Sequence, residues 1–314
     1  MGRKLPSRRD GTFIPGTLRV RIIPVLCLTA FLFLPCPAFA DWTPLIERLV
    51  ADGFDEPIVR EFFSRPEVRF EPSPMSSKLG ELVKKPYQKP AVLPPYNPKR
   101  VYKSLLKEKM ITRARSYLRE NTDLLENISS HYCVPKEIVV SILLVETRLG
   151  ELVGGKYAFN NLASMALCTD LEIIRPYLPK KLITKRNEDY ARTVCRQKAE
   201  WAYAELKALI DYAQVSGFDP LTLPGSIYGA IGLCQFLPSN VLSYGVDADH
   251  DGRIDLFTKV DALHSIANYL REHGWQCTMD KRGQVQVIFD YNKSSVYVNT
   301  VLAVVEKLRG RSRT

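Results

Sequence analysis

The feature that most constrains this chain is a strongly apolar stretch with one acidic residue near its end. Residues 134–150 read VPKEIVVSILLVETRLG. Pro135 suits a first helical turn, because its missing N–H would have no intrahelical partner there. Ile138, Ile142 and Glu146 are spaced by four residues, so they fall on one face of the predicted helix. The helix therefore carries a carboxyl group along its own apolar stripe.

The position of Glu146 suggests a chemical role. An ionised carboxylate among aliphatic side chains is costly unless it is paired or protonated. Burial raises the pKa of a carboxyl group, and a general acid that works near neutral pH needs such a raised pKa. The alternative is a structural glutamate at a helix end that pairs with Arg148 or with a backbone donor. This stretch alone does not decide between the two.

A glycine-rich motif follows at residues 225–239, GSIYGAIGLCQFLPS. Its glycines allow close approach of the backbone to a ligand or to another helix. Ser226 and Gln235 offer a hydroxyl and an amide that can hydrogen-bond a sugar. The alternative is a glycine-rich junction between helices with a capping serine.

These motifs together resemble the lytic murein transglycosylase B family, whose members cleave the glycan strands of peptidoglycan. The resemblance rests on ETRLG at 146–150, on the motif at 225–239, on NY and HGW within 268–275, and on YNKSSVY at 291–297. It implies a mainly α-helical fold, with a lysozyme-like catalytic core, an additional helical lobe and an EF-hand-like calcium loop.

The resemblance also implies roles for individual side chains. Glu146 would protonate the oxygen between N-acetylmuramic acid and N-acetylglucosamine, and its carboxylate would then take the proton of the muramoyl C6 hydroxyl. The product would be a 1,6-anhydro sugar, as for a carbon–oxygen lyase that acts on polysaccharide. The side chains expected to bind the substrate are Ser226, Gln235, Tyr269 and Tyr291.

Two rival functions remain at this point, a hydrolytic muramidase and a non-catalytic wall-binding module. Hydrolytic glycosidases usually need two carboxylates, and only Glu146 lies on an apolar helix face within a motif of the family. The presence of one such carboxylate instead of two favours the non-hydrolytic reaction.

Gln197-Lys198 stands where we expect an arginine pair in the family. A contact with substrate carboxylates is therefore weaker or altered, because lysine has no bidentate fork.

An aspartate-rich stretch, DADHDGRID, begins at residue 247. Carboxylates at loop positions one, three and five with glycine at six resemble an EF-hand calcium loop. Thr258 occupies position twelve, where a bidentate glutamate is usual. Some members of the resembled family have a longer loop, which implies Asp261 as the closing ligand. The loop would then span 247–261. The expected ligands are Asp247, Asp249, Asp251, Asp261 and the backbone carbonyl of Arg253. The calcium would be structural, and no organic cofactor is expected. The alternative is an aspartate-rich turn without metal.

The N-terminus is typical of an export signal. Six Lys and Arg side chains precede an apolar run at 22–34, and Ala38-Phe39-Ala40 fits a cleavage site. The run is short for a membrane span. We therefore predict that residues 1–40 are a cleaved signal peptide and that the mature protein is periplasmic, rather than anchored in the membrane.

Residues 41–99 are expected to form short helices within 42–70 and a proline-rich, extended arm over 71–99, packed on the core. Residues 100–310 would form the lytic transglycosylase domain. The helices expected there cover 105–131 (one long helix or two abutting ones), 134–150, a segment opened by Asn161 with Asn160 or Asn161 near its cap, 199–212, 261–273 and 296–308.

The charge balance of the chain indicates which kind of partner it binds. Beyond residue 40 the chain has 38 basic and 33 acidic residues. A mild positive excess favours an anionic partner such as peptidoglycan, whereas scattered charges without a recognisable motif speak against nucleic acid. We expect a monomer that binds glycan strands, with cell-wall synthesis proteins or amidases as further partners.

Five cysteines would remain after cleavage of the signal peptide, and their spacing does not determine how they pair. A disulfide between Cys168 and Cys195 is one option.

Overall fold

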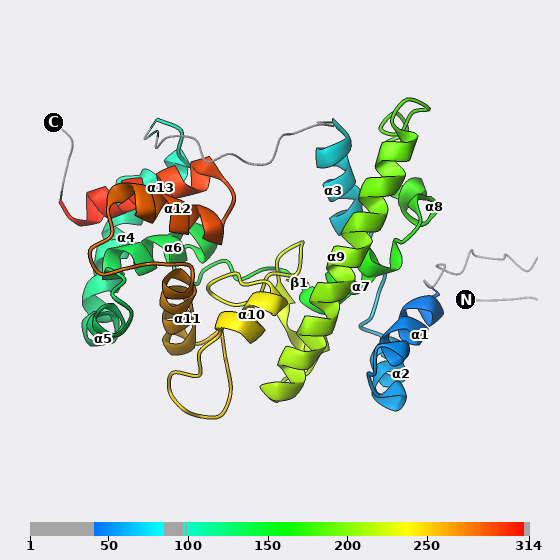
Figure 1. Cartoon of the computed structure of the whole chain (residues 1–314), viewed down its shortest axis with the longest axis horizontal. Coiled ribbons are helices and arrows are strands. Elements are labelled where there is room, and N and C mark those ends of the chain that lie inside the picture. The colour runs from blue at the N-terminus through cyan, green and yellow to red at the C-terminus, as the bar shows by residue number, and fades with distance from the viewer. Residues whose placement is uncertain (1–40, 85–96, 98, 311–314) are drawn as a thin grey trace, which may run out of the picture. The chain divides into compact units, whose positions relative to one another are not determined.

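The structure is a computed structural model that describes residues 41–84, 97 and 99–310 (Figure 1). These residues belong to one compact unit, which spans 39–314. Within them the secondary structure is almost wholly helical, with one two-stranded sheet. The predicted signal peptide and the last residues of the proline-rich segment, 85–96 and 98, lie outside the described residues.

The N-terminal segment forms three helices, α1 (Thr43–Ala51), α2 (Glu56–Ser64) and α3 (Ser73–Lys84). Helix α3 corrects the prediction of an extended arm over 71–99. Pro72 precedes this helix and Pro74 lies in its first turn, where proline is tolerated. No further proline occurs before Pro86, so the residues between are free to coil. Met75 and Leu79 of α3 are fully buried, which makes the helix part of the core.

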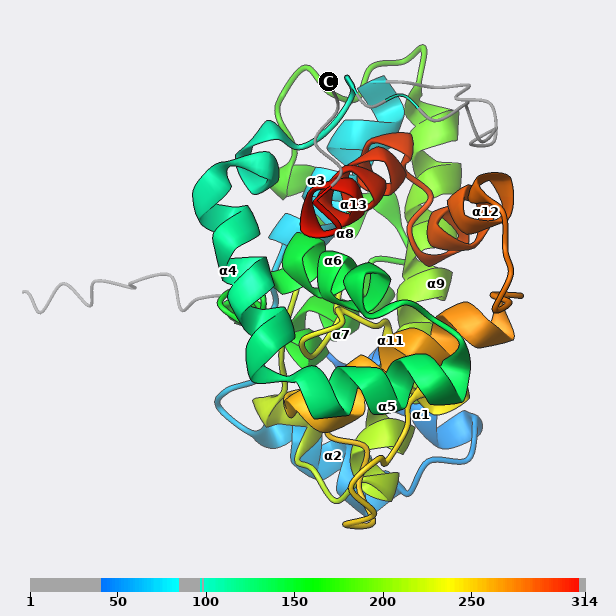
Figure 2. The same cartoon turned by 90° about the vertical axis from the view of Figure 1, so that its left-hand side faces the viewer.

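The helix that carries Glu146 lies in the next group of elements. These are the short 3-10 helix η1 (Lys103–Leu106), α4 (Glu108–Glu120), α5 (Thr122–Tyr132) and α6 (Lys136–Thr147). Helices α4 and α5 are the two abutting helices allowed by the pattern at 105–131. The residues from Ile138 to Leu144 are buried all round α6, because α4, α5, α11 and α13 all pack against it (Figure 2).

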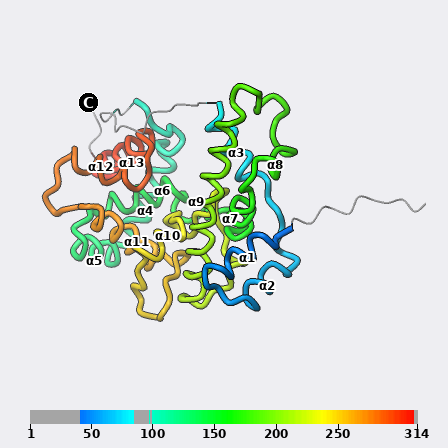
Figure 3. The backbone as a smooth tube through the Cα atoms, turned by 45° about the vertical axis from the view of Figure 1, so that its right-hand side comes forward, coloured from blue at the N-terminus to red at the C-terminus, as the bar shows by residue number. Residues whose placement is uncertain are grey.

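The middle of the chain holds the sheet and the longest helix. Its elements are β1 (Lys156–Tyr157), α7 (Ala158–Leu167), α8 (Leu171–Ile174), η2 (Arg175–Tyr177), α9 (Glu188–Val215), η3 (Pro220–Thr222) and β2 (Pro224–Gly225). Strand β1 pairs antiparallel with β2. Helix α7 packs against α9 and α3 (Figure 3). It begins at Ala158, so Asn160 and Asn161 lie inside the helix and do not cap it.

The C-terminal elements are α10 (Pro238–Tyr244), α11 (Lys259–Glu272), α12 (Lys281–Tyr291) and α13 (Ser295–Leu308). Helix α12 was not predicted, because its apolar run from Val285 to Phe289 is short and has no clear helical period. Asp280 caps it by accepting a hydrogen bond of 2.8 Å from the N–H of Gly283. Ser294 caps α13 in the same way, through the N–H of Tyr297.

One disulfide joins Cys133 and Cys277, whose Cα atoms are 4.7 Å apart. It ties the corner between α5 and α6 to the segment after α11. Cys168 and Cys195 do not form the bond that the sequence left open; the Cys195 thiol instead donates to the Cys168 carbonyl. Cys234 is also a buried free thiol.

Across the described chain, no single helix is both long and apolar enough to cross a membrane. Helices α5 and α6 taken together are long and apolar enough for a membrane span, but the chain bends by 111° between them. The predicted apolar run at 22–34 lies outside the described residues.

Candidate active site

The five side chains predicted to cleave or bind the substrate line one pocket of about 300 Å³. They come from α6, from the glycine-rich loop between β2 and α10, from α11 and from the end of α12. Only the fold brings these distant segments together. The five residues are Glu146, Ser226, Gln235, Tyr269 and Tyr291.

Glu146 lies in the last turn of α6 and is half-buried. Among the described residues, no cation forms an ion pair with it, and the exposed Arg148 adopts a left-handed backbone at the helix end. The structural ion pair considered for Glu146 is therefore absent there. Burial raises the pKa of the Glu146 carboxyl to about 7. Near neutral pH this carboxyl is thus present in both its protonated and its ionised form.

Tyr297 is the neighbour of Glu146 that the sequence did not single out. Its hydroxyl favours the ionised carboxylate and so lowers the pKa of Glu146, which offsets part of the effect of burial. The hydroxyl is buried and forms no hydrogen bond within the described chain, so the two side chains are neighbours rather than a hydrogen-bonded pair. The available signal was the motif at 291–297, which ends on this tyrosine in a helix that packs on α6.

The glycine-rich loop holds Ser226 by its own backbone. The Ser226 hydroxyl oxygen accepts hydrogen bonds from the N–H groups of Tyr228, at 3.3 Å, and Ala230, at 3.1 Å. The amide of Asn161, which is fully buried, donates to the Ser226 carbonyl at 2.9 Å. At Gly229 a Cβ atom would lie 2.5 Å from the side chain of Leu162, so the loop needs glycine to pack on α7. Asn161 thus supports the site from inside α7, whereas its place in the sequence suggested a helix cap.

Gln235 adopts a left-handed backbone conformation with φ of 51°. Its side-chain amide donates to the carbonyl of Gly232 at 2.9 Å and lies 3.4 Å from that of Val153. The side-chain oxygen has no donor within the described chain and can accept a ligand N–H or O–H. A non-glycine residue held in this conformation next to an acid is typical of a functional site.

An aromatic wall forms the other side of the pocket. The rings of Tyr269 and Tyr291 meet edge to face, with centroids 4.9 Å apart. The Tyr269 hydroxyl donates to the Asp290 carbonyl at 3.0 Å, and the Tyr269 ring stacks on His273 at 3.9 Å. Asn240 and Asn292 complete the polar lining. Asn292 lies within the motif at 291–297, whereas Asn240 lies outside the motifs of the sequence analysis.

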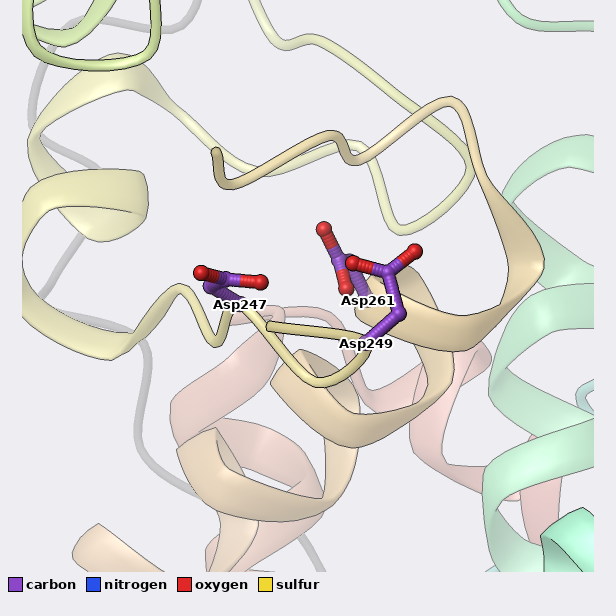
Figure 4. A group of neighbouring side chains, drawn as sticks. All are labelled: Asp247, Asp249 and Asp261. Atoms are coloured by element: carbon purple, nitrogen blue, oxygen red, sulfur yellow. The ribbon is translucent and has the colours of Figure 1, made fainter. Parts of the chain in front are cut away.

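The aspartate-rich loop lies before α11 and forms a carboxylate cluster. One carboxylate oxygen each of Asp247, Asp249 and Asp261 lies within 4.8 Å of the others (Figure 4). Asp261 is buried, and burial together with the other two carboxylates raises its pKa. Thr258 instead caps α11 by accepting from the N–H of Asp261. Asp261, and not Thr258, therefore completes the cluster.

Asp251 and Arg253 lie on the exposed part of the same loop. The Asp251 carboxylate is not part of the cluster and accepts a hydrogen bond of 2.9 Å from the N–H of Arg253. Three clustered carboxylates, one of them buried, repel one another unless a cation lies between them. This donor set of hard oxygen atoms fits a divalent ion such as calcium.

The fold and the pocket define a mainly helical protein with a single protonatable acid in a small polar cleft. The chain belongs to the transglycosylase SLT domain family, whose model matches residues 38–288 and so includes α1 to α3. It is similar to membrane-bound lytic murein transglycosylase B of Escherichia coli (strain K12), with 35% identity over 153 residues. That match covers 49% of this chain and 35% of the relative, so the chain spans about a third of that protein's length.

Several solved structures share the fold, and two of them are described here by their likeness to this chain. The Escherichia coli lytic transglycosylase Slt35 in complex with calcium is 22% identical, with a TM-score of 0.64, and the match covers 87% of this chain and 94% of that one. SltB3 from Pseudomonas aeruginosa in complex with NAG-anhNAM-pentapeptide is 20% identical, with a TM-score of 0.61, covering 86% and 79%. At these identities the likeness concerns the fold alone, and it confirms the mainly helical, lysozyme-like class.

Proposed function

We propose that this protein is a peptidoglycan lytic transglycosylase, a lyase that cleaves the β-1,4 bond between N-acetylmuramic acid and N-acetylglucosamine without consuming water. Membership of the family supports this function. The observation that carries it is a half-buried carboxyl, with a pKa of about 7, as the only acidic side chain among the described residues that line the pocket. A hydrolase would usually need a second carboxylate there.

The proton of Glu146 starts the reaction. The protonated carboxyl gives its proton to the bridging oxygen as the bond from that oxygen to the muramoyl C1 breaks. The resulting carboxylate, which the Tyr297 hydroxyl favours, takes the proton of the muramoyl C6 hydroxyl. The C6 oxygen then bonds to C1 and closes the 1,6-anhydro ring. Glu146 ends the cycle protonated, and a pKa near the working pH suits both steps.

The other lining residues position the sugar. The free side-chain oxygen of Gln235 accepts an acetamido N–H or a hydroxyl, and the Ser226 hydroxyl can donate its proton to a sugar oxygen. The rings of Tyr269 and Tyr291 restrict where the sugar lies. Fixed partners of this kind lower the barrier by orienting the C6 hydroxyl toward C1.

We also propose that Asp247, Asp249, Asp251, Asp261 and the carbonyl of Arg253 hold a structural calcium ion. The carboxylate cluster supports this site, as does the calcium complex of Slt35. A bound divalent ion supplies positive charge that offsets the repulsion between the carboxylates. The loop leads directly into α11, so a rigid loop helps to fix Tyr269.

The natural substrate would be the glycan strands of peptidoglycan, as the ligand of SltB3 suggests. We propose that the chain is exported with a cleaved signal peptide and acts in the periplasm as a monomer, in cell-wall remodelling or recycling. Cell-wall synthesis proteins or amidases would be further partners. Sequencing the N-terminus of the purified mature protein tests the export step; a chain that retains residues 1–40 would contradict it.

The direct test of catalysis compares the wild type with Glu146→Gln. The variant keeps the shape of the side chain but has no proton to give. We expect the wild type to release soluble fragments from purified peptidoglycan and the folded variant to release none. Wild-type activity in Glu146→Gln would refute the assignment, and binding without release by the wild type would favour a wall-binding module.

A further inference from the structure

A buried acidic side chain that the proposed mechanism does not use lies within α9. Glu205 is only 6% exposed. Among the described residues it forms no ion pair, and its polar partner is Ser239 of α10. Its Oε2 accepts a hydrogen bond of 3.0 Å from the Ser239 N–H, and its Oε1 accepts one of 2.9 Å from the Ser239 hydroxyl. Burial of a carboxyl group is costly unless the group is hydrogen-bonded, so these two bonds account for its position.

This contact caps the first turn of α10. The first N–H groups of a helix have no partner within the helix, and a side chain at the N-cap position usually accepts one of them. Leu237 occupies that position in α10 and makes no such bond, and Pro238, which follows it, has no N–H. The N–H of Ser239 is therefore the first donor of the helix. Glu205 accepts from it across 34 residues of sequence, in place of the missing local cap.

The rest of α10 is also fixed by its neighbours. The helix packs against α9 and α11, and Figure 1 shows it between these two. Val241 is fully buried. At the far end of the helix, the carbonyl of Tyr244 accepts a hydrogen bond of 3.1 Å from the side-chain amide of Asn268 in α11. Glu205 at the first turn and Asn268 at the last turn thus hold the helix at both ends.

The first turn of α10 borders the Glu146 pocket. Asn240 directly follows Ser239 and lines this pocket, together with Leu237. The side-chain amide of Asn240 forms no hydrogen bond within the described chain. An amide group offers two N–H donors and an acceptor oxygen. All of them are available to a ligand in the pocket.

We propose that Asn240 binds the sugar in the Glu146 pocket, and that Glu205 is a positioning residue that holds Asn240 there through Ser239. This inference rests on the proposed function. The hydroxyl and acetamido groups of an N-acetylated sugar match the donors and the acceptor of the Asn240 amide. With the first turn of α10 capped, the Asn240 side chain is already in place before the sugar binds, so less conformational entropy is lost on binding. Without the cap, the first turn loses the bond that fixes its orientation.

Two variants of Glu205 separate positioning from charge. Glu205→Ala removes both bonds to Ser239. Glu205→Gln keeps them, because its amide oxygen can accept from the Ser239 N–H and its N–H can donate to the Ser239 hydroxyl oxygen. We expect kcat/KM on peptidoglycan strands to fall about tenfold in Glu205→Ala and to stay within about twofold of the wild type in Glu205→Gln. Ile128→Val, at a fully buried position of α5 outside the pocket, is the control for lost stability. It should melt lower and keep kcat/KM at a temperature well below melting.

A double-mutant cycle shows whether Glu205 acts through Asn240. We expect Asn240→Ala to lower kcat/KM about tenfold, as for one lost hydrogen bond to the sugar. In the Asn240→Ala background, Glu205→Ala should then cause less than about a twofold further loss, because the group that it positions is already gone. Losses that multiply to about a hundredfold would overturn the proposal. So would wild-type kcat/KM in Asn240→Ala, or a Glu205→Gln protein as impaired as Glu205→Ala.

If Glu205→Ala does not fold, Ser239→Ala takes its place in the cycle, because it loses only the hydroxyl bond. We expect a loss of about threefold that disappears in the Asn240→Ala background, and a loss that persists there would overturn the proposal.

Failure of the proposed function is read separately. A wild type that cleaves no strand refutes that function, and the cycle is then measured by calorimetry as the Kd of the N-acetylglucosamine tetrasaccharide. Weaker binding in both single variants, with no further loss in the double variant, supports the positioning role. Equal Kd values in all four proteins overturn it.

Discussion

The hydroxyl of Tyr291 donates a hydrogen bond of 2.7 Å to the backbone carbonyl of Cys234. Tyr291 ends α12, whereas Cys234 precedes Gln235 in the glycine-rich loop. This bond therefore closes the pocket between two segments that are far apart in the sequence. It also fixes the loop one residue away from the amide that we assign to substrate binding.

Replacing Tyr291 with Phe removes this bond and keeps the ring. We expect a loss of stability of about 1 to 2 kcal/mol, because the buried carbonyl loses its donor. We also expect kcat to fall about tenfold or more, because the loop that holds Gln235 is less well positioned. Thermal melting and initial rates on peptidoglycan measure the two effects. Stability and rate both equal to the wild type would contradict the role given to this contact.

The pH dependence of the rate reports on Glu146. Its carboxyl has a pKa of about 7, so activity should fall above that pH as the general acid loses its proton. The Tyr297 hydroxyl favours the ionised form and lowers this pKa. In Tyr297→Phe the pKa rises, and the alkaline limb of the kcat/KM profile should move to higher pH. A limb that stays in place, or moves to lower pH, would contradict the effect assigned to Tyr297.

Stability should also depend on Glu146. Its pKa is raised by folding from 4.5 to about 7, so the folded state binds the proton more tightly than the unfolded state. The resulting stability is fully present below pH 4.5 and is lost as the pH rises to about 7. The loss is at most about 3 kcal/mol, and less where water reaches the carboxyl. Glu146→Gln should therefore melt higher than the wild type near pH 8, with a smaller gap near pH 4. A gap that does not depend on pH would contradict the raised pKa.

Calcium should stabilise the loop at 247–261. At a concentration one hundred times its Kd, a bound ion adds about 2.7 kcal/mol to the free energy of unfolding. We expect a higher melting temperature in calcium than in chelator for the wild type. Asp261→Asn should lose this difference, because it weakens the cluster, and Asp189→Asn, a matched change at an exposed position of α9, should keep it. Equal melting of the wild type in calcium and chelator, with no bound metal, would remove the proposal.

Glu146 and the residues around it illustrate what a sequence can predict. The four-residue spacing of Ile138, Ile142 and Glu146 predicts a helix with a carboxyl near its apolar stripe, and the structure places α6 there. The other four pocket residues came from matched motifs. Their meeting in one pocket depends on tertiary packing, which no local pattern encodes. Tyr297 was missed for that reason, because it approaches Glu146 only through the packing of α13 on α6.

Two local predictions failed for identifiable reasons. The prolines around α3 suggested an extended arm, although only Pro74 enters the helix and it occupies a permitted position. Asn160 and Asn161 resemble helix caps, but their buried amides instead bond to the carbonyls of Glu67 and Ser226. The pairing of Cys133 with Cys277 could not be deduced either, because spacing leaves several connectivities open.

The mass spectrum of the products tests the central claim most directly. Purified peptidoglycan is digested with the wild-type protein, and the muramoyl ends of the soluble fragments are examined. If the Glu146 carboxylate takes the proton of the C6 hydroxyl so that the C6 oxygen bonds to C1, those ends are 1,6-anhydro sugars, which are lighter by one water than reducing ends. Fragments that end in reducing muramoyl residues in place of 1,6-anhydro sugars would contradict the account and identify a hydrolase.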